Sequence, residues 1–302
     1  MYHYIRDPTD TKDGGLKTLL VNEFHSQVRL LKTKYEMATL DAAIEFLEGK
    51  YKPSRDICLL TFDDGLVDHY LNVTPILLKE NIQGLFFLIT SCLEYNKVID
   101  VHKNHFLMAH LTFKDYKQSF LSELSRYKDF VEIPINSAMA KKTYRWDNRS
   151  VAEFKFLINY LIADDLRAKV LKKLFAKYIG DEEEFSKILY LSWSQAKTMQ
   201  EHGMILGGHS HSHRPYSMLS PEEQKKDIIA CIASIRKNLK EQTLLTFSYP
   251  YGKSHSFDNH TVNYLVGNGV CCAFTSEHGD SKRHGDLYSI SRIDAKTIKD
   301  EI

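Results

Sequence analysis

Two short apolar segments restrict the fold of this chain more than any other feature of its sequence. Residues 57–62 (ICLLTF) and 84–89 (GLFFLI) are apolar runs of strand length, and residues 70–80 between them have a helical pattern. A strand that is apolar along its whole length is typical of a parallel sheet covered on both faces. A strand, a helix and a second strand in this order form a βαβ unit. The sequence therefore predicts an α/β fold built on a parallel sheet.

The same alternation of strands and helices occurs in the flanking parts of the chain. Further strands are expected at residues 2–5, 204–207, 244–249 and 270–275, and further helices around residues 20–31, 39–49, 193–202, from 220 onward and at 257–267. The helix at 220 opens with Ser-Pro-Glu-Glu, which combines a capping box with proline at the first helical position. Turn-forming residues at about 7–15 predict a loop.

The alternation stops between about residues 96 and 191. Long helical patterns at 104–126 and 151–179 replace it, with a polar, irregular stretch around 132–150 between them. We interpret this region as a helical insertion. Residues 1–302 are therefore expected to form one domain that is interrupted by an insertion at about 96–191.

The composition is that of an ordinary globular protein, with 43% hydrophobic and 26% charged residues. Forty lysines and arginines against 39 aspartates and glutamates give a net charge of +1, so nucleic-acid binding is not expected. The start has no basic and apolar leader, and no apolar window is long enough to span a bilayer, which predicts a cytoplasmic protein without a transmembrane segment. Five cysteines without a C-x-x-C pair indicate buried thiols.

The first motif that could take part in catalysis follows the apolar run at 57–62. Asp63 and Asp64 stand next to each other and precede Gly65. Such a sequence can simply form a turn. At the end of a buried parallel strand, however, both carboxylates are expected at the rim of the sheet, where parallel α/β folds build their active sites.

The second motif is the histidine-rich segment at residues 207–213 (GGHSHSH). His209 and His213 are four positions apart and can face one metal ion from a single helical turn, whereas His211 would face elsewhere. A polar surface loop is the alternative interpretation. Two imidazoles and one carboxylate suit Zn²⁺ or another divalent first-row ion and leave positions open for water and substrate. A second carboxylate beside the ligand can accept the proton of the activated water.

Together the two motifs resemble those of a known family. TFDDG at 61–65 and HSHSH at 209–213 closely resemble the TFDDG and H-[ST]-x-x-H motifs of the NodB-homology polysaccharide deacetylases, carbohydrate esterase family 4. FSYPYG at 247–252 is similar to the third motif of one branch. The resemblance covers about residues 1–95 and 192–295. It implies an α/β fold of the distorted (β/α) barrel type with fewer than eight strands.

The resemblance also implies roles for individual residues. It assigns Asp63 as the general base, Asp64, His209 and His213 as metal ligands, Ser210 as a brace of the histidine segment, and the backbone N–H of Tyr251 as an oxyanion-hole donor. The metal is expected to be Zn²⁺, with Co²⁺, Ni²⁺ or Fe²⁺ as alternatives, because the ligand set does not select among them.

The chain departs from the family pattern at two places. Ser248 stands where many members have an arginine that pairs with the base, and we expect Arg292 to replace that arginine from a final strand. The usual L-x-x-H segment, the source of the general acid, is not recognisable. His278, after the strand at 270–275, and His3 are the candidates for the acid. A polar group at 100–105 could contact substrate or cap a helix.

The function implied by the resemblance is a metal-dependent hydrolase that removes an N-acetyl group from an amino sugar of a bacterial surface glycan or its precursor. Because the sequence shows no leader, we expect the substrate to be a precursor rather than finished cell wall. The candidates are a sugar nucleotide, a lipid-linked glycan and a lipopolysaccharide intermediate. Two alternatives stay open: hydrolysis of an N-formyl group or cyclic amide on the same fold, or glycan binding without turnover. The exact sugar, the oligomeric state and the role of the insertion are not predicted.

Overall fold

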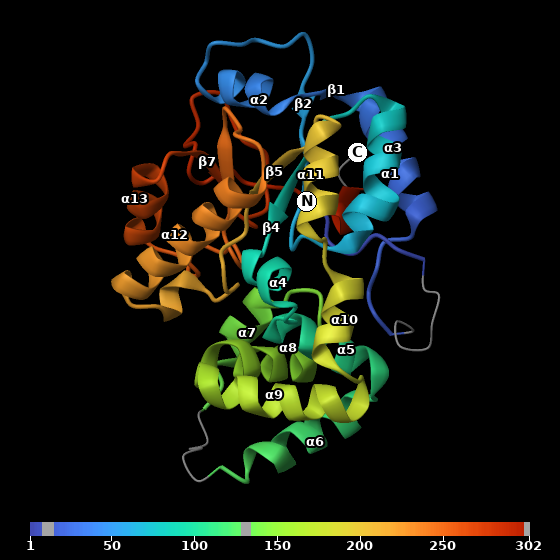
Figure 1. The fold of residues 1–302 in the computed structure, drawn as a ribbon, viewed down its shortest axis with the longest axis vertical. Helices are drawn as coiled ribbons and strands as arrows, with labels where there is room; N and C mark the ends of the chain where they lie inside the picture. The colour runs from blue at the N-terminus through green and yellow to red at the C-terminus, as the bar shows by residue number, and fades with distance from the viewer. Residues whose placement is uncertain (8–14, 128–133, 299–302) are drawn as a thin grey trace. The chain divides into compact units, whose positions relative to one another are not determined.

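The computed structural model describes residues 1–7, 15–127 and 134–298 (Figure 1). Most of the loop predicted at 7–15 therefore lies outside the described residues. The chain divides into two compact units. The first, called here the barrel unit, comprises Met1–Asp7, Thr18–Asn96 and Lys187–Ile302. The second, called here the insertion unit, comprises Lys97–Ser186 together with a short segment that ends at Lys17.

The barrel unit contains a five-stranded parallel sheet in which each strand pairs with the next one along the chain. Its strands are β3 (Leu60–Phe62), β4 (Gly84–Leu88), β5 (Ile205–Gly208), β6 (Leu245–Ser248) and β7 (Val270–Phe274). Every residue of β3, β4 and β6 is buried, as expected for strands covered on both faces. The predicted α/β class with a parallel sheet is confirmed.

The apolar run at 57–62 is divided between two sheets rather than forming one strand. Its first part, β2 (Ile57–Cys58), pairs with β1 (Glu36–Met37), and only β3 joins the large sheet. The strand predicted at 2–5 is also reduced, to isolated bridges from Tyr2 to Phe62 and from Ile5 to Leu19. Each segment changes its pairing partner along its length, which a hydrophobic pattern does not reveal.

Segments from the two ends of the described chain close the curled sheet. Tyr2 bridges to the outer edge of β3, and Ile290 bridges to the outer edge of β7. The Ala295 N–H donates to the Met1 carbonyl over 3.1 Å, so the two segments also contact each other. We call these segments, residues 1–5 and 290–295, the seam. The result is the distorted barrel with fewer than eight strands that the motifs predict.

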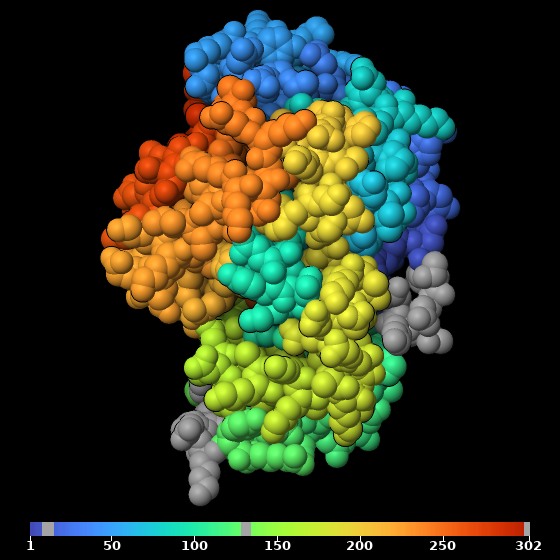
Figure 2. All heavy atoms as spheres, in the orientation of Figure 1, coloured from blue at the N-terminus to red at the C-terminus, as the bar shows by residue number. Residues whose placement is uncertain are grey.

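Helices cover the sheet of the barrel unit. They are α1 (Val21–Lys34), α2 (Leu40–Leu47), α3 (Thr74–Glu80), α4 (Thr90–Tyr95), α11 (Trp193–Glu201), α12 (Pro221–Asn238) and α13 (Asn259–Gly267). In the space-filling view, α11 in yellow and α12 in orange form part of the near surface of this unit (Figure 2). The capping box predicted from Ser220 and Glu223 is present at the start of α12. The helix predicted at 70–80 begins as a π-helical turn, His69–Val73, before α3.

The insertion unit is built from helices packed around aromatic residues. They are α5 (Asp100–His110), α6 (Phe113–Leu124), α7 (Ser137–Thr143), α8 (Arg149–Phe156), a π-helical turn (Leu157–Leu161), α9 (Asp164–Tyr178) and the first part of α10 (Glu182–Leu189), whose residues from Lys187 on are assigned to the barrel unit. The predicted helix at 104–126 is two helices, because Thr112 caps α6 by accepting the Asp115 N–H. The predicted helix at 151–179 is likewise interrupted, at Ile162 and Ala163.

No helix in the described part of the chain has the length and apolar character needed to cross a membrane. The larger segment of the insertion unit runs from Lys97 to Ser186. The insertion at about 96–191 stays a prediction. That residues 1–302 form one deacetylase domain stays a prediction.

Candidate active site

The two aspartates follow β3 directly and are buried at the rim of the sheet. Asp64 has a φ of +79° and Gly65 a φ of +62°, so two consecutive residues adopt left-handed backbone conformations. Aspartate tolerates this conformation better than most residues. The sharp turn lets adjacent carboxylates serve different partners: Asp63 contacts Arg292, whereas Asp64 contacts the histidines of the second motif.

The histidine loop, residues 209–213, follows β5 and is not helical. Ser210 has a φ of +64° and His213 a φ of +57°. The prediction that one helical turn aligns His209 and His213 is therefore wrong, because a spacing of four residues is compatible with a folded loop as well. The Ser210 hydroxyl accepts the His213 N–H over 2.7 Å, as the expected brace would.

Asp64, His209 and His213 form a cluster whose potential ligand atoms all lie within 4.8 Å of one another. Asp64 Oδ1 lies 3.4 Å from His209 Nε2 and 3.5 Å from His213 Nε2. Tetrahedral Zn²⁺ with bonds of about 2.0–2.1 Å would separate its ligand atoms by about 3.3 Å. His209 Nδ1 lies 2.7 Å from the Ser248 carbonyl, which fixes the tautomer that leaves Nε2 as a ligand. The donor set and its spacing fit a divalent cation.

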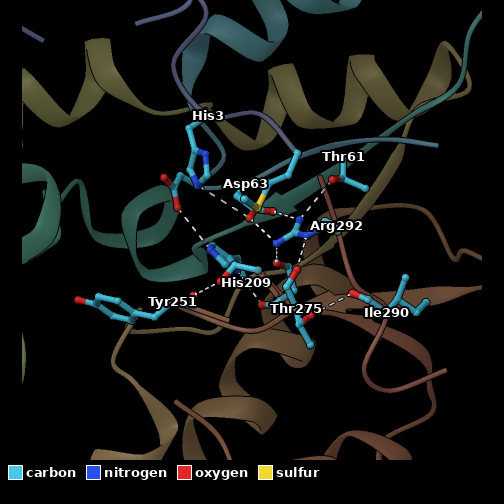
Figure 3. Close-up of polar contacts among 12 residues, drawn as sticks. His3, Thr61, Asp63, His209, Tyr251, Thr275, Ile290 and Arg292 are labelled. Atoms are coloured by element: carbon cyan, nitrogen blue, oxygen red, sulfur yellow. Dashed lines mark hydrogen bonds and ion pairs between the residues drawn. The ribbon is translucent and has the colours of Figure 1, made fainter. Parts of the chain in front are cut away.

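Arg292 forms a bidentate ion pair with Asp63 (Figure 3). Its Nη1 and Nη2 donate to the two carboxylate oxygens over 2.9 and 2.8 Å, and both side chains are buried. Nη2 also donates to the Ser248 hydroxyl over 2.9 Å, and Nε donates to the Thr275 carbonyl over 2.6 Å. The small Ser248 side chain thus leaves room for a guanidinium that comes from the seam. The expected final strand is no more than the bridge at Ile290.

The electrostatics of the cluster favour an ionised base and a bound cation. Burial would raise the pKa of Asp63, but Arg292 and His209 outweigh it and hold that pKa well below its usual value. Burial would lower the pKa of His209, but Asp63 and Asp64 outweigh it and raise that pKa. The raised pKa of His209 shows that the two carboxylates make this position favourable for positive charge.

The third motif places Tyr251 beside the histidines. Its ring lies 5.3 Å from the His213 ring, centroid to centroid. Tyr251 has a φ of +62° and Gly252 a φ of +61°, which repeats after β6 the backbone turn found after β3. A Cβ at Gly252 would lie 2.5 Å from the Ser276 nitrogen, so only glycine fits there. Tyr249, in contrast, is a packing residue whose ring stacks on Phe257.

The two candidate acids occupy different places. His3 Nε2 lies 3.9 Å from Asp63 Oδ2, and its side chain is 43% exposed. Figure 3 shows His3 and Arg292 on opposite sides of Asp63. His278 is exposed on the loop after β7 and borders a cavity of about 830 Å³ whose wall includes Arg292 and Thr61.

Two charged residues of the polar group at 100–105 form ion pairs within the insertion unit. Lys103 forms a 2.9 Å ion pair with Glu182, and Asp100 accepts a hydrogen bond from Arg167 over 2.9 Å.

Sequence reasoning missed Asp227, whose carboxylate accepts two N–H groups of the histidine loop. The signal that could have found it is its spacing: Asp227 is half-buried and lies three residues after Gln224 and four before Cys231, both of which are buried on the inward side of α12.

Fold and site together define an α/β barrel protein with an Asp-His-His cluster at the carboxyl ends of its strands. The sequence pattern of the polysaccharide deacetylase family matches residues 156–271, which include the histidine loop and the whole third motif. The putative polysaccharide deacetylase YxkH of Bacillus subtilis (strain 168) is 25% identical over 294 residues, which are 97% of this chain and 69% of that protein.

Solved structures show the same fold. The Streptococcus pyogenes deacetylase PplD, in complex with acetate, superposes with a TM-score of 0.60 at 16% identity over 97% of this chain and 88% of its own. IcaB from Ammonifex degensii superposes with a TM-score of 0.58 at 17% identity over 99% of this chain and 91% of its own. A de-N-acetylase from Aggregatibacter actinomycetemcomitans superposes with a TM-score of 0.58 at 16% identity over 100% of this chain and 97% of its own. The match to the polysaccharide deacetylase family over residues 156–271 agrees with the family that the motifs resemble.

Proposed function

We propose that the protein is a metal-dependent N-deacetylase that acts on an amino sugar of a bacterial surface glycan or its precursor. One observation carries the proposal: Asp64 lies within 3.5 Å of both histidine nitrogens, while the neighbouring Asp63 is ionised and held by Arg292. This arrangement provides a cation site and a base side by side.

Asp64, His209 and His213 would hold the cation, for which Zn²⁺ is the first candidate and Co²⁺, Ni²⁺ and Fe²⁺ are alternatives. A divalent ion bound there would lower the pKa of water and polarise the amide carbonyl. The hydrogen bond from His209 to the Ser248 carbonyl orients the imidazole for this role.

The remaining residues would handle protons and charge. Asp63 accepts a proton from the attacking water, and Arg292 fixes the orientation of that carboxylate. The Tyr251 N–H stabilises the negative charge that develops on the carbonyl oxygen. His3, which flanks Asp63 on the side opposite Arg292, donates a proton to the nitrogen as the C–N bond breaks. Water and the acetamido group are thereby converted into acetate and a free amine.

The substrate class is supported by the names of the relatives. The Bacillus subtilis protein is a putative polysaccharide deacetylase, and the similar structures include a deacetylase and a de-N-acetylase. Within this class, a sugar nucleotide, a lipid-linked glycan or a lipopolysaccharide intermediate is the precursor we propose. The cytoplasmic location stays a prediction.

The proposal is tested by metal analysis and product release. Purified protein loaded with Zn²⁺ is incubated with acetylated and formylated amino sugars, sugar nucleotides and oligosaccharides, and acetate and formate are measured. Loss of a general base lowers turnover by about 10²–10⁴-fold, so Asp63→Asn should abolish most acetate release while metal content stays near one ion per chain. Formate release alone would favour the N-formyl alternative. Glycan binding without either product would favour a non-catalytic homologue.

The role of His3 has its own test. His3→Gln should lower kcat by about 10²-fold, the lower range for a general acid, with metal content unchanged. The matched variant is His278→Gln, which removes the other candidate and should keep kcat within about twofold of the wild-type value. Reversed effects of the two variants would assign the acid to His278.

A further inference from the structure

The histidine loop has a backbone that its own sequence does not favour. Ser210 and His213 both have positive φ values, in a region that residues other than glycine rarely adopt. The loop carries two of the three proposed metal ligands, and these are separated by three residues whose backbone determines where His213 lies relative to His209. Groups outside the loop must therefore hold it in this shape.

Asp227, on α12, contacts the middle of the loop with both carboxylate oxygens. Oδ1 accepts the His211 N–H and Oδ2 accepts the Ser212 N–H, each over 2.9 Å. Oδ1 also accepts the hydroxyl proton of Tyr216 over 3.0 Å. Burial and the Asp227 carboxylate raise the pKa of Tyr216 well above its usual value, so the phenol keeps its proton and donates it.

The opposite groups of the loop are held by the start of α4. The Thr90 N–H donates to the Ser210 carbonyl, and the Ser91 N–H donates to the His211 carbonyl, each over 3.2 Å. The Thr90 hydroxyl lies 2.9 Å from His211 Nδ1. The loop therefore lies between two helices: α4 binds its carbonyl oxygens, and Asp227 of α12 binds its N–H groups.

From this arrangement we infer that Asp227 is a positioning residue that sets the affinity of the Asp64–His209–His213 cluster for its metal ion. The inference rests on the proposed metal site. An ionised carboxylate that accepts two backbone N–H groups is a strong, directional restraint. Without it, the amides of His211 and Ser212 would turn toward water, and His213 would lose its fixed distance from His209.

Metal affinity of the protein provides the test. Zn²⁺ dissociation constants are measured by competition with a chromophoric chelator for wild type, Asp227→Asn and Glu222→Gln. Asparagine keeps one acceptor oxygen but turns an NH₂ group toward the second amide. Partners of metal ligands typically contribute 10- to 100-fold to affinity, so Asp227→Asn should bind Zn²⁺ about 10- to 100-fold more weakly. Glu222→Gln removes the same charge from the exposed start of α12 and should bind like wild type.

Excess metal separates positioning from general destabilisation. At limiting Zn²⁺, Asp227→Asn should release acetate slowly, and kcat should recover at saturating Zn²⁺ while KM for the sugar stays unchanged. The thermal unfolding midpoint of the metal-free variant should remain close to that of Glu222→Gln. A kcat loss that saturating metal does not relieve would overturn the inference.

A second variant covers the case in which Asp227→Asn does not fold. Tyr216→Phe removes one hydrogen bond from the Asp227 carboxylate and should weaken Zn²⁺ binding severalfold, less than Asp227→Asn. If the variant that folds binds Zn²⁺ with wild-type affinity, the inference about Asp227 is overturned, but the proposed function is not. A wild-type protein that binds no Zn²⁺ would instead overturn the proposed function, so the two failures are distinguishable.

Discussion

The loops at the rim of the barrel unit and the helices of the insertion unit obtain their shapes in opposite ways. Four non-glycine residues of the rim have positive φ values: Asp64, Ser210, His213 and Tyr251. Between residues 97 and 186, the described part of the insertion unit has positive φ only at Gly180. Its helices α6, α7 and α8 begin at ordinary side-chain caps. Non-glycine residues with positive φ thus occur in the loops that carry the proposed chemistry and not in the described part of residues 97–186, and surrounding contacts offset their strain.

The two units also differ in how their carboxylates pair with cationic side chains. Asp63 pairs with the guanidinium of Arg292, which also binds two neutral oxygens. In the insertion unit, Asp100 is shared between Arg167 at 2.9 Å and Lys103 at 3.8 Å, so it has two cationic partners. A site built around one strong pair is more vulnerable to substitution than a network, and the following predictions measure that difference.

The largest effect is expected from Arg292→Met. This variant leaves the buried Asp63 carboxylate without its main partner and should lower the free energy of unfolding by about 3–5 kcal/mol. Arg167→Met in the insertion unit should cost clearly less, because Lys103 still lies near Asp100. Urea unfolding followed by circular dichroism provides both values. Equal losses would contradict the contrast between a single pair and a network.

A smaller effect is expected from acid, through His69. Its ring is buried next to Phe62 and Phe86, and burial lowers its pKa from 6.5 to about 4. The unfolded chain therefore binds a proton first, and the free energy of unfolding falls as pH drops from about 6.5 to about 4. Linkage gives a loss of about 2 kcal/mol between pH 7 and pH 5.

Urea unfolding at pH 7 and pH 5 checks this prediction by comparing wild type with His69→Gln. Glutamine can still reach the His3 carbonyl, which His69 contacts over 3.1 Å, but it does not titrate in this range. The variant should lose less stability between the two pH values. An unchanged pH dependence would show that other groups cause the acid sensitivity.

A third prediction isolates the tight turn that follows β6. Gly252→Ala and Gly203→Ala both place alanine at positive φ, at +61° and +86°. Only at Gly252 does the new Cβ meet backbone, 2.5 Å from the Ser276 nitrogen. Both variants should lose about 1–2 kcal/mol from the left-handed conformation, and Gly252→Ala should lose about 1–2 kcal/mol more from overpacking. Thermal unfolding of the pair measures the difference, and equal losses would show that the turn can relax.

The smallest effect is expected on the surface of the insertion unit. Arg149 pairs with Glu153 over 2.8 Å, but its side chain is 75% exposed. Exposed pairs of this helical spacing contribute about 0.3–0.5 kcal/mol, so Arg149→Ala should change the free energy of unfolding by no more than that. A loss above 1 kcal/mol would indicate that the insertion unit depends on its surface pairs.

Sequence patterns predicted the parts of this molecule that are determined locally. The apolar runs before Asp63 and His209 revealed strands, and their order revealed the parallel sheet. The aspartates and histidines were found because the residues of each motif are close together in sequence. The approach of Arg292 to Asp63 was only a hypothesis, since it depends on contacts between residues more than 200 positions apart.

Other features had no local signal. The spacing of His209 and His213 fits a helical turn and a folded loop equally. Contacts with Asp227, with α4 and within the loop itself hold the folded form. The division of residues 57–62 between two sheets depends on the position of β1, which a run of apolar letters does not specify. Polar contacts between distant elements therefore account for most of what the sequence left open.

Closure of the barrel through its seam has a consequence for biosynthesis. His3 leaves the ribosome long before Arg292, yet both flank the Asp63 carboxylate. A nascent polypeptide released before residue 292 would have to desolvate that carboxylate without a counter-ion. The proposed base therefore acquires its counter-ion only after translation has passed Arg292.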